Sequence, residues 1–268
     1  MMANTAERIA ALLGSGPVEL SPMSGGDLSS VFAIYDDNGR DLVAKQGGAA
    51  EVEARMLRAI SASGAPAPDV IAAEDDLLVI ARCPSGGSRS GSWASLADIL
   101  DTLHASEGDR YGWPDDYAFG KVAIVNREST DWAAFWAENR LACHIPHVDT
   151  RLAKRLEKLA ANIAGHLSHD PRPSLLHGDL WGGNILFADG RVSALIDPAC
   201  YHGDREVDVA MLTLFDHPPR DFFARLNLAV GWEERQPLYR LWPLLVHLRL
   251  FGSAYAGQVD AELRKLGC

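Results

Sequence analysis

The sequence predicts an α+β fold with a small, antiparallel β-rich N-terminal lobe that carries one helix, and a larger, mainly helical C-terminal lobe. Three observations favour this division. Residues 29–46 hold two apolar, β-branched runs on either side of a turn. Residues 83–92, CPSGGSRSGS, are rich in Pro, Gly and Ser, which is typical of a linker. Apolar residues further along recur mostly at helical spacing. We therefore expect a lobe over 1–82, a hinge over 83–92 and a second lobe over 93–268.

The small lobe is expected to begin with a short helix and to continue with the hairpin, whose turn is Asp-Asn-Gly at residues 37–39. Residues 49–64 place apolar side chains four positions apart, and Gly64 ends this helix. Residues 65–70, APAPDV, must be extended because a residue before proline avoids the α conformation. Residues 76–82, DLLVIAR, are then predicted to form a buried strand.

The large lobe is predicted to be a series of amphipathic helices interrupted by one hairpin. The hairpin has its arms in NILFA and VSALID and its turn at Asp189-Gly190. The helical spacing of apolar residues is clearest in the third of the helices. The predicted helices cover residues 93–105, 130–145, 149–168, 205–215 and 236–251.

Composition excludes several classes of protein. The 268 residues carry a formal net charge of -11, and such an acidic surface repels a phosphate backbone, so we expect no nucleic-acid partner. The four cysteines form no C-x-x-C pair, which suits a reducing compartment. No apolar run reaches the roughly 20 residues of a membrane span, and the N-terminus lacks a secretory pattern. We expect a cytoplasmic protein without a membrane partner, and we favour a monomer.

The stretch LLHGDLWGGNILF, residues 175–187, carries the clearest chemistry. Asn184 precedes the first arm of the second hairpin and Asp197 ends the second arm, so strand pairing brings the two side chains roughly opposite each other. Carboxylate and amide oxygens are hard ligands of the kind that Mg²⁺ prefers. Asp179, on the preceding loop, is placed to accept a hydroxyl proton and orient a nucleophile. The spacing matches the catalytic loop of kinases.

The small lobe is expected to supply the other contacts of a nucleotide. Gly25 and Gly26 precede the first hairpin, where backbone N–H groups can approach phosphates, although such a turn is often only structural. Lys45 ends a strand in LVAKQ, much like the phosphate-binding lysine of kinases. Glu53 on the next helix can pair with it. Glu51 is the competitor, but its position near the helix start suits an interaction with the helix dipole.

Other polar residues near the motif have structural readings. His177 is expected to be a packed, hydrogen-bonded histidine that supports the loop. Asp208, near the start of a helix, could hydrogen-bond the backbone of the loop, or be a simple first-turn carboxylate. Arg205 and Glu206 are compatible with surface charges alone.

Several motifs together resemble the fructosamine kinase (ketosamine-3-kinase) family. These are LLHGDLWGGN, LIDPACYHGDREVDVAMLTLF, YGWPDD, DWAAFWAENRL and EERQPLYRLWPLLVHLRLFGSAY. The family belongs to the aminoglycoside and choline phosphotransferase group of kinase-like enzymes. The resemblance implies a protein-kinase-like bilobal fold and ATP-dependent phosphorylation of the sugar 3-hydroxyl of a ketosamine, which is the adduct of an amine with a reducing sugar. The acceptor could be a small molecule or protein-bound.

The resemblance also implies a role for each matching residue. Asp179 would be the catalytic base, and Asn184 and Asp197 would hold Mg²⁺. Lys45 would contact the α- and β-phosphates of ATP, and Glu53 would orient Lys45.

Two further residues are assigned to the substrate side through the resemblance, and three others depart from it. Trp181 would form part of a wall against the sugar, and His247 resembles a histidine of the C-terminal helix near the substrate, although a buried core histidine explains it as well. Asp204 stands where a histidine is usual, and Tyr117 and Val125 depart from the family pattern on the acceptor side. The glycine-rich turn lacks the cysteine that some members carry.

Three other readings stay open. The acceptor could be another hydroxylated amine of the aminoglycoside, choline or homoserine type. The chain could be a non-catalytic nucleotide-binding module, although the base, the metal ligands and the lysine are all present. It could also be a metal-dependent hydrolase that uses His177, Asp179 and the H-x-x-H pairs at 144–147 and 166–169, but neither pair has the Glu of an H-E-x-x-H motif.

Overall fold

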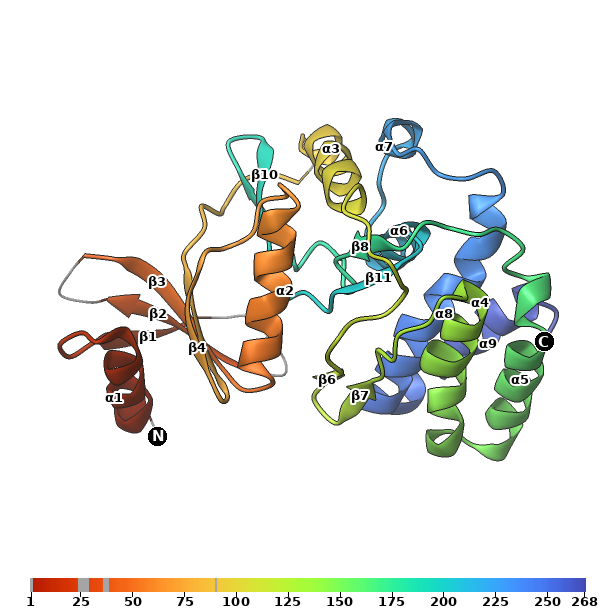
Figure 1. Cartoon of the computed structure of the whole chain (residues 1–268), viewed down its shortest axis with the longest axis horizontal. Helices are drawn as coiled ribbons and strands as arrows, with labels where there is room; N and C mark the ends of the chain where they lie inside the picture. Colours follow the sequence, from red (N-terminus) through yellow and green to blue (C-terminus); the bar gives the residue numbers. More distant parts are fainter. Residues whose placement is uncertain (1, 24–28, 36–38, 90) are drawn as a thin grey trace.

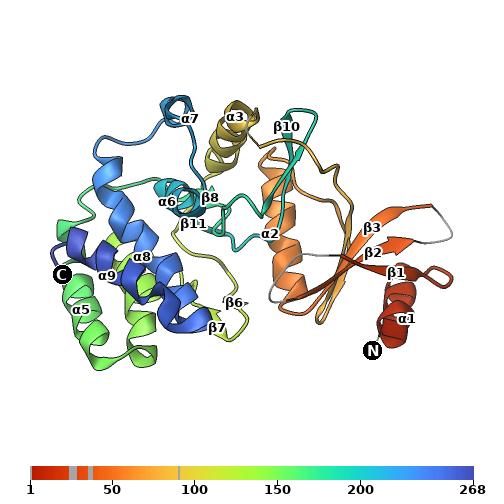
Figure 2. The same cartoon turned by 180° about the vertical axis from the view of Figure 1, so that it is seen from behind.

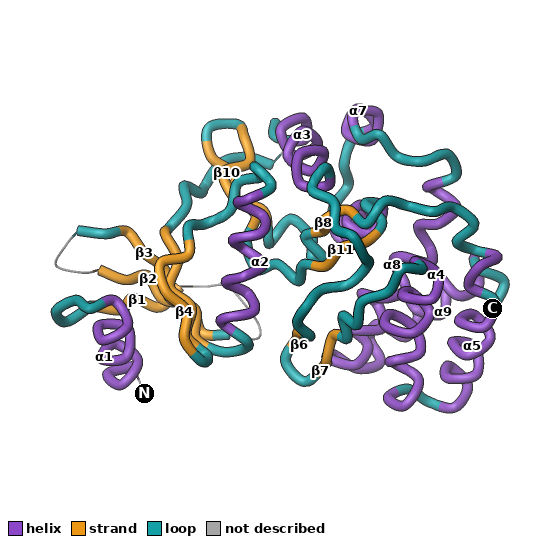
Figure 3. The backbone as a smooth tube through the Cα atoms, in the orientation of Figure 1, coloured by secondary structure: helices purple, strands orange, loops and turns teal. Residues whose placement is uncertain are grey.

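The protein consists of two unequal lobes that lie side by side along the long axis of the molecule (Figure 1). The computed structural model describes residues 2–23, 29–35, 39–89 and 91–268. Strands are concentrated in the small lobe and helices in the large one (Figure 3). The predicted α+β class is confirmed. Gly25 and Gly26, predicted to approach the phosphates, lie outside the described residues.

The small lobe is a five-stranded antiparallel sheet in the order β1-β2-β3-β5-β4. Alternate residues of β5 point to opposite faces. Leu77 and Val79 pack with Ile9 of α1, whereas Leu78 packs with α2, so each helix covers one face of the sheet. The elements are α1 (Met2–Leu13), β1 (Glu19–Met23), β2 (Ser30–Tyr35), β3 (Asp41–Gln46), α2 (Ala50–Ala62), β4 (Val70–Glu74) and β5 (Leu77–Ala81).

Helix α2 belongs to two hydrophobic cores at once. Ala54 and Leu57 pack against the sheet. Met56 and Ile60, both fully buried, pack into a cluster of the large lobe that includes Leu180 of the loop at residues 177–184. The helix is therefore held from both sides, and Figure 1 shows it between the sheet and the large lobe.

The large lobe is a helical body with three short antiparallel pairs of strands. Figure 2 shows α8 and α9 across its other side. The helices are α3 (Trp93–His104), α4 (Trp132–Trp136), α5 (Thr150–Ala161), α6 (Glu206–Phe215), α7 (Arg220–Arg225), α8 (Trp232–Phe251) and α9 (Ala256–Lys265). The strand pairs are β6 (Tyr117–Phe119) with β7 (Val122–Ile124), β8 (Ser174–Leu176) with β11 (Tyr201–Gly203), and β9 (Ile185–Ala188) with β10 (Arg191–Leu195).

The segment predicted as one helix over 130–145 changes its winding twice. Helix α4 continues as a π-helix at Ala137–Leu141 and as a 3-10 helix at Ala142–His147. The wider turn lies where Arg140 enters the aromatic core, with its guanidinium 4.2 Å from the ring centroid of Tyr201. The cation is fully buried and donates hydrogen bonds to the segment at 125–126. A buried arginine thus positions the chain that leads from β7 to α4.

Some elements were not predicted from the sequence, among them β1, the β6–β7 pair, α7 and α9. None of them contains more than two buried apolar residues, so no period could be read from their sequences.

Candidate active site

The second hairpin forms as predicted and brings its two polar ends together. Strands β9 and β10 pair in antiparallel register, and beyond them the N–H of Ile196 donates to the carbonyl of Asn184 at 3.0 Å. The next residue, Asp197, has a φ of +52°, in the left-handed region that non-glycine residues seldom adopt. Such strained conformations cluster at functional sites.

Asp208 holds the loop that precedes the hairpin, residues 177–184, through hydrogen bonds to its backbone. This fully buried carboxylate accepts hydrogen bonds from the N–H groups of His177 and Gly178, both at 2.9 Å, and from His104 at 3.0 Å. Gly178 has a φ of +80°, and a Cβ there would lie 2.0 Å from the carbonyl oxygen of Ala199. Asp208 lies in the first turn of α6, but its contacts go to the loop, so of the two readings the loop contact is the one that the geometry favours.

His177 is a neutral, structural histidine. Its side chain is fully buried, and burial lowers the pKa of the imidazole. Nδ1 accepts the N–H of Asp179 at 3.3 Å, which leaves the proton on Nε2 to be donated to the carbonyl of Ile196 at 3.0 Å. The ring therefore ties the catalytic loop to the strand that leads to Asp197.

Asp179 lies at the floor of a cavity with its carboxylate held in place. The amide nitrogen of Asn184 donates to its Oδ2 at 3.1 Å and to its carbonyl at 2.9 Å. Burial raises the pKa of Asp179 to about 7, a shift that the nearby Asp197 carboxylate increases and the hydrogen bond from Asn184 opposes. A carboxylate with a pKa near neutrality is suited to take a proton during a reaction.

Lys45 joins the two lobes through a pair of carboxylates. Its Nζ is 2.9 Å from both carboxylate oxygens of Glu53 and 3.0 Å from Oδ1 of Asp197. Burial would lower the pKa of Lys45, but these two carboxylates outweigh it and raise the pKa. The ammonium is thus charged and fixed at the edge of the cavity. Glu51 is exposed on the opposite side of α2.

Tyr117 adds a contact that the sequence did not predict. Its hydroxyl donates to Oε2 of Glu53 at 3.2 Å, and burial raises the pKa of the phenol far above its usual range. A second bridge, from Arg55 to Asp115 at 3.0 Å, joins the same two segments at the surface. The β6–β7 segment of the large lobe therefore holds the carboxylate that positions Lys45.

Replacing Tyr117 by Phe should lower kcat by about threefold to tenfold, the value of a typical single hydrogen bond. The Glu53 carboxylate loses a donor, so Lys45 is held less firmly, and the KM for ATP should rise. Steady-state kinetics and a thermal melt would measure the effect. Tyr35→Phe, at an exposed residue of β2, is the control. Unchanged kinetic constants in Tyr117→Phe would contradict the role.

A cavity of about 810 Å³ connects several of these groups with an apolar region. At one end it is lined by Lys45, Glu53, Asp179, Asn184 and Asp197. At the other end it is lined mainly by aromatic and aliphatic side chains of α6, α8 and the turn after α8.

The two residues assigned to the substrate side both line this cavity. Trp181 is 40% exposed, and its ring packs so close to Gly183 that a Cβ there would lie 2.3 Å from the indole. His247 lies among aromatic rings, and its Nδ1 is 2.7 Å from the carbonyl of Pro243. The structure thus places both at the apolar end.

The comparison with known proteins decides the family. A family model described as fructosamine kinase matches residues 1–267. A "probable ketoamine kinase" of Staphylococcus aureus is 32% identical over 92% of this chain and 93% of its own, and one of Lactiplantibacillus plantarum is 34% identical over 91% and 93%.

The chain belongs to the fructosamine kinase family.

Solved structures agree with this assignment. A Thermobifida fusca protein that carries the provisional name fructosamine-3-kinase superimposes with a TM-score of 0.89 at 27% identity, over 97% of both chains. An aminoglycoside phosphotransferase in complex with AMP-PNP and hygromycin B superimposes with a TM-score of 0.70 at 20% identity, over 98% of both chains, which shows the shared kinase-like fold. This fructosamine kinase family member is an ATP-dependent phosphotransferase, as predicted. Among the described residues, no helix has the length and apolar character to cross a membrane.

In this member of the family the predicted hinge lies against the second hairpin, formed by β9 and β10. The N–H of Gly87 donates to the carbonyl of Phe187 at 2.7 Å. Arg89 forms an ion pair with Asp216 at the end of α6, and the other oxygen of Asp216 accepts the N–H of Gly182 at 2.7 Å. Arg89 and Asp216 thus support the catalytic loop. Sequence reasoning missed them, because no local pattern joins residues 127 positions apart.

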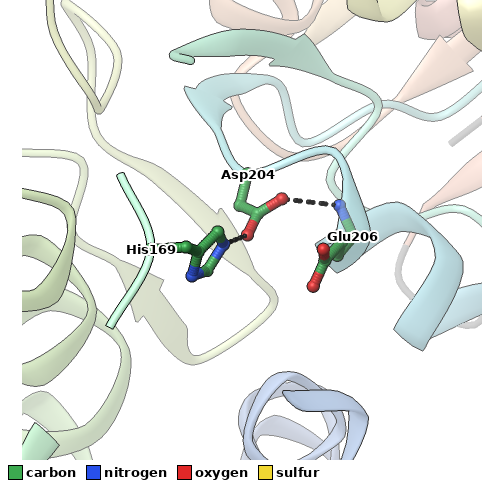
Figure 4. Close-up of side chains that lie close together, drawn as sticks. All are labelled: His169, Asp204 and Glu206. Atoms are coloured by element: carbon green, nitrogen blue, oxygen red, sulfur yellow. Dashed lines mark hydrogen bonds and ion pairs between the residues drawn. The ribbon is translucent and has the colours of Figure 1, made fainter. Parts of the chain in front are cut away.

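A second polar cluster lies below the site, at His169, Asp204 and Glu206, whose possible ligand atoms lie within 4.8 Å of one another (Figure 4). Each group already has a partner. Asp204 contacts His169, accepts the hydroxyl of Tyr239 at 2.7 Å and accepts the N–H of Glu206 at 3.0 Å. Both oxygens of Glu206 accept from Arg235, at 2.7 and 2.8 Å. Because a guanidinium so close repels a cation, we interpret the cluster as a charge network that joins α6 to α8.

The expectation that Arg205 and Glu206 are only surface charges is wrong for Glu206. Its side chain is 1% exposed, and Arg235, twenty-nine positions along the chain, compensates its charge. Arg205 lies nearer the surface and pairs with Asp101 at 3.1 Å. Adjacent residues point in different directions at the start of a helix, so their sequence alone did not separate them.

Proposed function

We propose that the chain transfers the γ-phosphoryl group of ATP to the sugar 3-hydroxyl of a ketosamine, with Mg²⁺ bound to the triphosphate. The observation that supports this most is the single cavity, which joins a base, a lysine and two oxygen-bearing side chains to an apolar wall that includes Trp181. Membership of the fructosamine kinase family supports ketosamines as the acceptor class.

The residues of the cavity suit in-line phosphoryl transfer. The hydroxyl oxygen of the acceptor forms a bond to the γ-phosphorus as the bond from that phosphorus to the bridging oxygen of ADP breaks. The hydroxyl proton passes to the carboxylate of Asp179, and ADP leaves. Lys45, fixed by Glu53, would neutralise the α- and β-phosphates. Catalysis of this kind comes mainly from positioning and from charge stabilisation.

Asn184 and Asp197 fit the ligand set of a magnesium ion. The amide nitrogen of Asn184 is used by Asp179, which leaves its carbonyl oxygen as the available atom. Only Oδ1 of Asp197 is engaged among the described residues, by Lys45. Two protein oxygens beside a triphosphate match the few protein ligands that Mg²⁺ usually takes. When bound, the ion would neutralise charge on the phosphate oxygens.

Substituting Asp197 by Asn should weaken the binding of Mg-ATP by about tenfold or more, because a charged oxygen ligand is lost. Isothermal titration with AMP-PNP, in Mg²⁺ and in EDTA, would measure it. In EDTA the two proteins should bind the nucleotide with similar affinity. Asp189→Asn, in the turn of the same hairpin, is the matched control. An undiminished magnesium effect in Asp197→Asn would argue against the metal role.

A substrate panel tests the function itself. We expect ADP release with fructosamine, ribulosamine or erythrulosamine derivatives, and a phosphorus NMR signal coupled to the sugar 3-position of the product. Choline, homoserine and an aminoglycoside serve as the competing acceptors. Turnover confined to one of these would replace the proposed acceptor, and turnover of ketosamines at another hydroxyl would overturn the 3-position.

A further inference from the structure

The apolar end of the cavity is a cluster of aromatic side chains, here called the aromatic mouth. Each ring centroid lies within 6.0 Å of at least one other. Three of the side chains are strongly exposed for aromatic residues, at 40% for Trp181, 39% for Phe215 and 48% for Phe251. The aromatic mouth consists of Trp181, Phe215, His247, Phe251 and Tyr255. Exposed aromatic faces gathered at the end of a cavity are characteristic of a binding surface for an apolar group.

Charge is distributed unevenly along the cavity. Among its described lining residues, the charged side chains are Lys45, Glu53, Asp179 and Asp197. All four lie at the end of the cavity opposite the aromatic mouth, where we place the phosphoryl transfer. No described lysine or arginine lines the aromatic mouth. Burial lowers the pKa of His247, so the imidazole there is neutral. Lys121, next to Gly120 of the lining, is exposed and is not among the lining residues.

This distribution discriminates between substituents on the amine of the acceptor. The amine of a ketosamine is protonated near neutral pH, and the faces of aromatic rings attract a cation. An apolar substituent next to it would remove the exposed rings from water, which is favourable. A carboxylate in the same place would lose water without meeting a cationic side chain, and it would add to three carboxylates already in the cavity.

We propose that the preferred acceptor is a ketosamine whose amine carries an apolar substituent without a carboxylate, and that the aromatic mouth beyond Trp181, which we assign to the sugar, binds this substituent. This inference rests on the ketosamine kinase function proposed above, and it specifies the part of the substrate that is not sugar.

Four acceptors separate the two effects. They share the ketose that the substrate panel shows to react best, and they differ only in the amine: benzylamine, methylamine, glycine and glycinamide. The benzylamine derivative should exceed the methylamine derivative in kcat/KM by about tenfold, mainly through a lower KM, because the phenyl group is buried. The kcat/KM of the glycine derivative should be about tenfold lower than that of the glycinamide derivative, which has the same size but no carboxylate.

Substitutions of Phe251 test whether both acceptor preferences arise from the aromatic mouth. Phe251→Ala should reduce the preference for benzylamine over methylamine. Phe251→Lys should raise the kcat/KM of the glycine derivative relative to glycinamide, because the new ammonium compensates the carboxylate. Tyr35→Ala and Tyr35→Lys make the same changes at a 54% exposed aromatic residue of β2 outside the cavity, and should leave both ratios as in the unsubstituted protein.

The outcomes are distinguishable. Equal kcat/KM for the four derivatives, or a preference for the glycine derivative, would overturn the inference and leave the ketosamine kinase function standing. Ratios that shift as much in the Tyr35 variants as in the Phe251 variants would also overturn it. Absence of turnover with every ketosamine would overturn the proposed function, and the inference with it. The comparison of acceptors needs no variant, so it holds even if a substituted protein fails to fold.

Discussion

Replacement of Asp179 by Asn is expected to lower kcat by about a thousandfold, within the range for loss of a general base. The side chain keeps its size and can keep its contact with Asn184, but it can no longer accept the hydroxyl proton. Binding of ATP should change little, because Lys45 and Asp197 remain. ADP release and nucleotide titration would measure the two quantities. Near-normal turnover in Asp179→Asn would refute the base assignment.

The Asp179→Asn substitution should also change the thermal stability of the protein. Burial raises the pKa of Asp179 to about 7, whereas an unfolded aspartate titrates near 4. A carboxyl with a raised pKa favours the folded state only while it is protonated. Its contribution to the free energy of unfolding therefore falls as the pH rises from about 4 to 7 and is lowest above 7. The substitution should therefore raise Tm at pH 8 by about 5–10 °C and have little effect near pH 4. Asp189→Asn controls for the loss of one negative charge. An equal gain at both pH values would contradict the burial explanation.

Substitution of Asp208 by Ala should lower the free energy of unfolding by about 3–5 kcal/mol. The N–H groups of His177 and Gly178 would lose their acceptor inside the core, and His104 would lose its partner. Burial would raise the pKa of Asp208, but the hydrogen bond from His104 holds it below its usual value, so a charged group is removed. Urea unfolding at neutral pH would measure the loss.

Asp101→Ala is the control for this substitution. Asp101 is also paired, with Arg205, but its side chain is 59% exposed, so its removal should cost less than about 1 kcal/mol. A loss of under 1 kcal/mol in Asp208→Ala would show that the catalytic loop does not depend on this carboxylate.

The parts of the site that could be predicted from the sequence are those set by local structure. A two-residue turn sets the register of a hairpin, here to within the one residue added by a β-bulge between Val192 and Ala194, so the approach of Asn184 to Asp197 followed from the position of Asp189-Gly190. The pairing of Lys45 with Glu53 followed from a strand and the helix directly after it. In both cases the chain between the two residues is short enough for its geometry to decide the contact.

The parts that could not be predicted join segments that are distant in the chain. The contact of Tyr117 with Glu53 depends on how the two lobes pack, and that of Arg89 with Asp216 depends on how the hinge lies against the large lobe. No periodicity of one segment indicates which partner the other will supply. The burial of Glu206 is of the same kind, because its compensating arginine lies on another helix. Such partners become visible only when the fold is known.

The placement of α2 between two cores has a consequence for control of the enzyme. In a kinase whose equivalent helix can swing outward, activity can be switched by moving the glutamate away from the lysine. Here Met56 and Ile60 are sealed into the larger half of the molecule, so such a swing would expose two fully buried apolar side chains to water. The lysine–glutamate pair is therefore assembled before either reactant arrives. We expect the rate in the cell to follow the supply of sugar adducts and ATP, with no activating modification required.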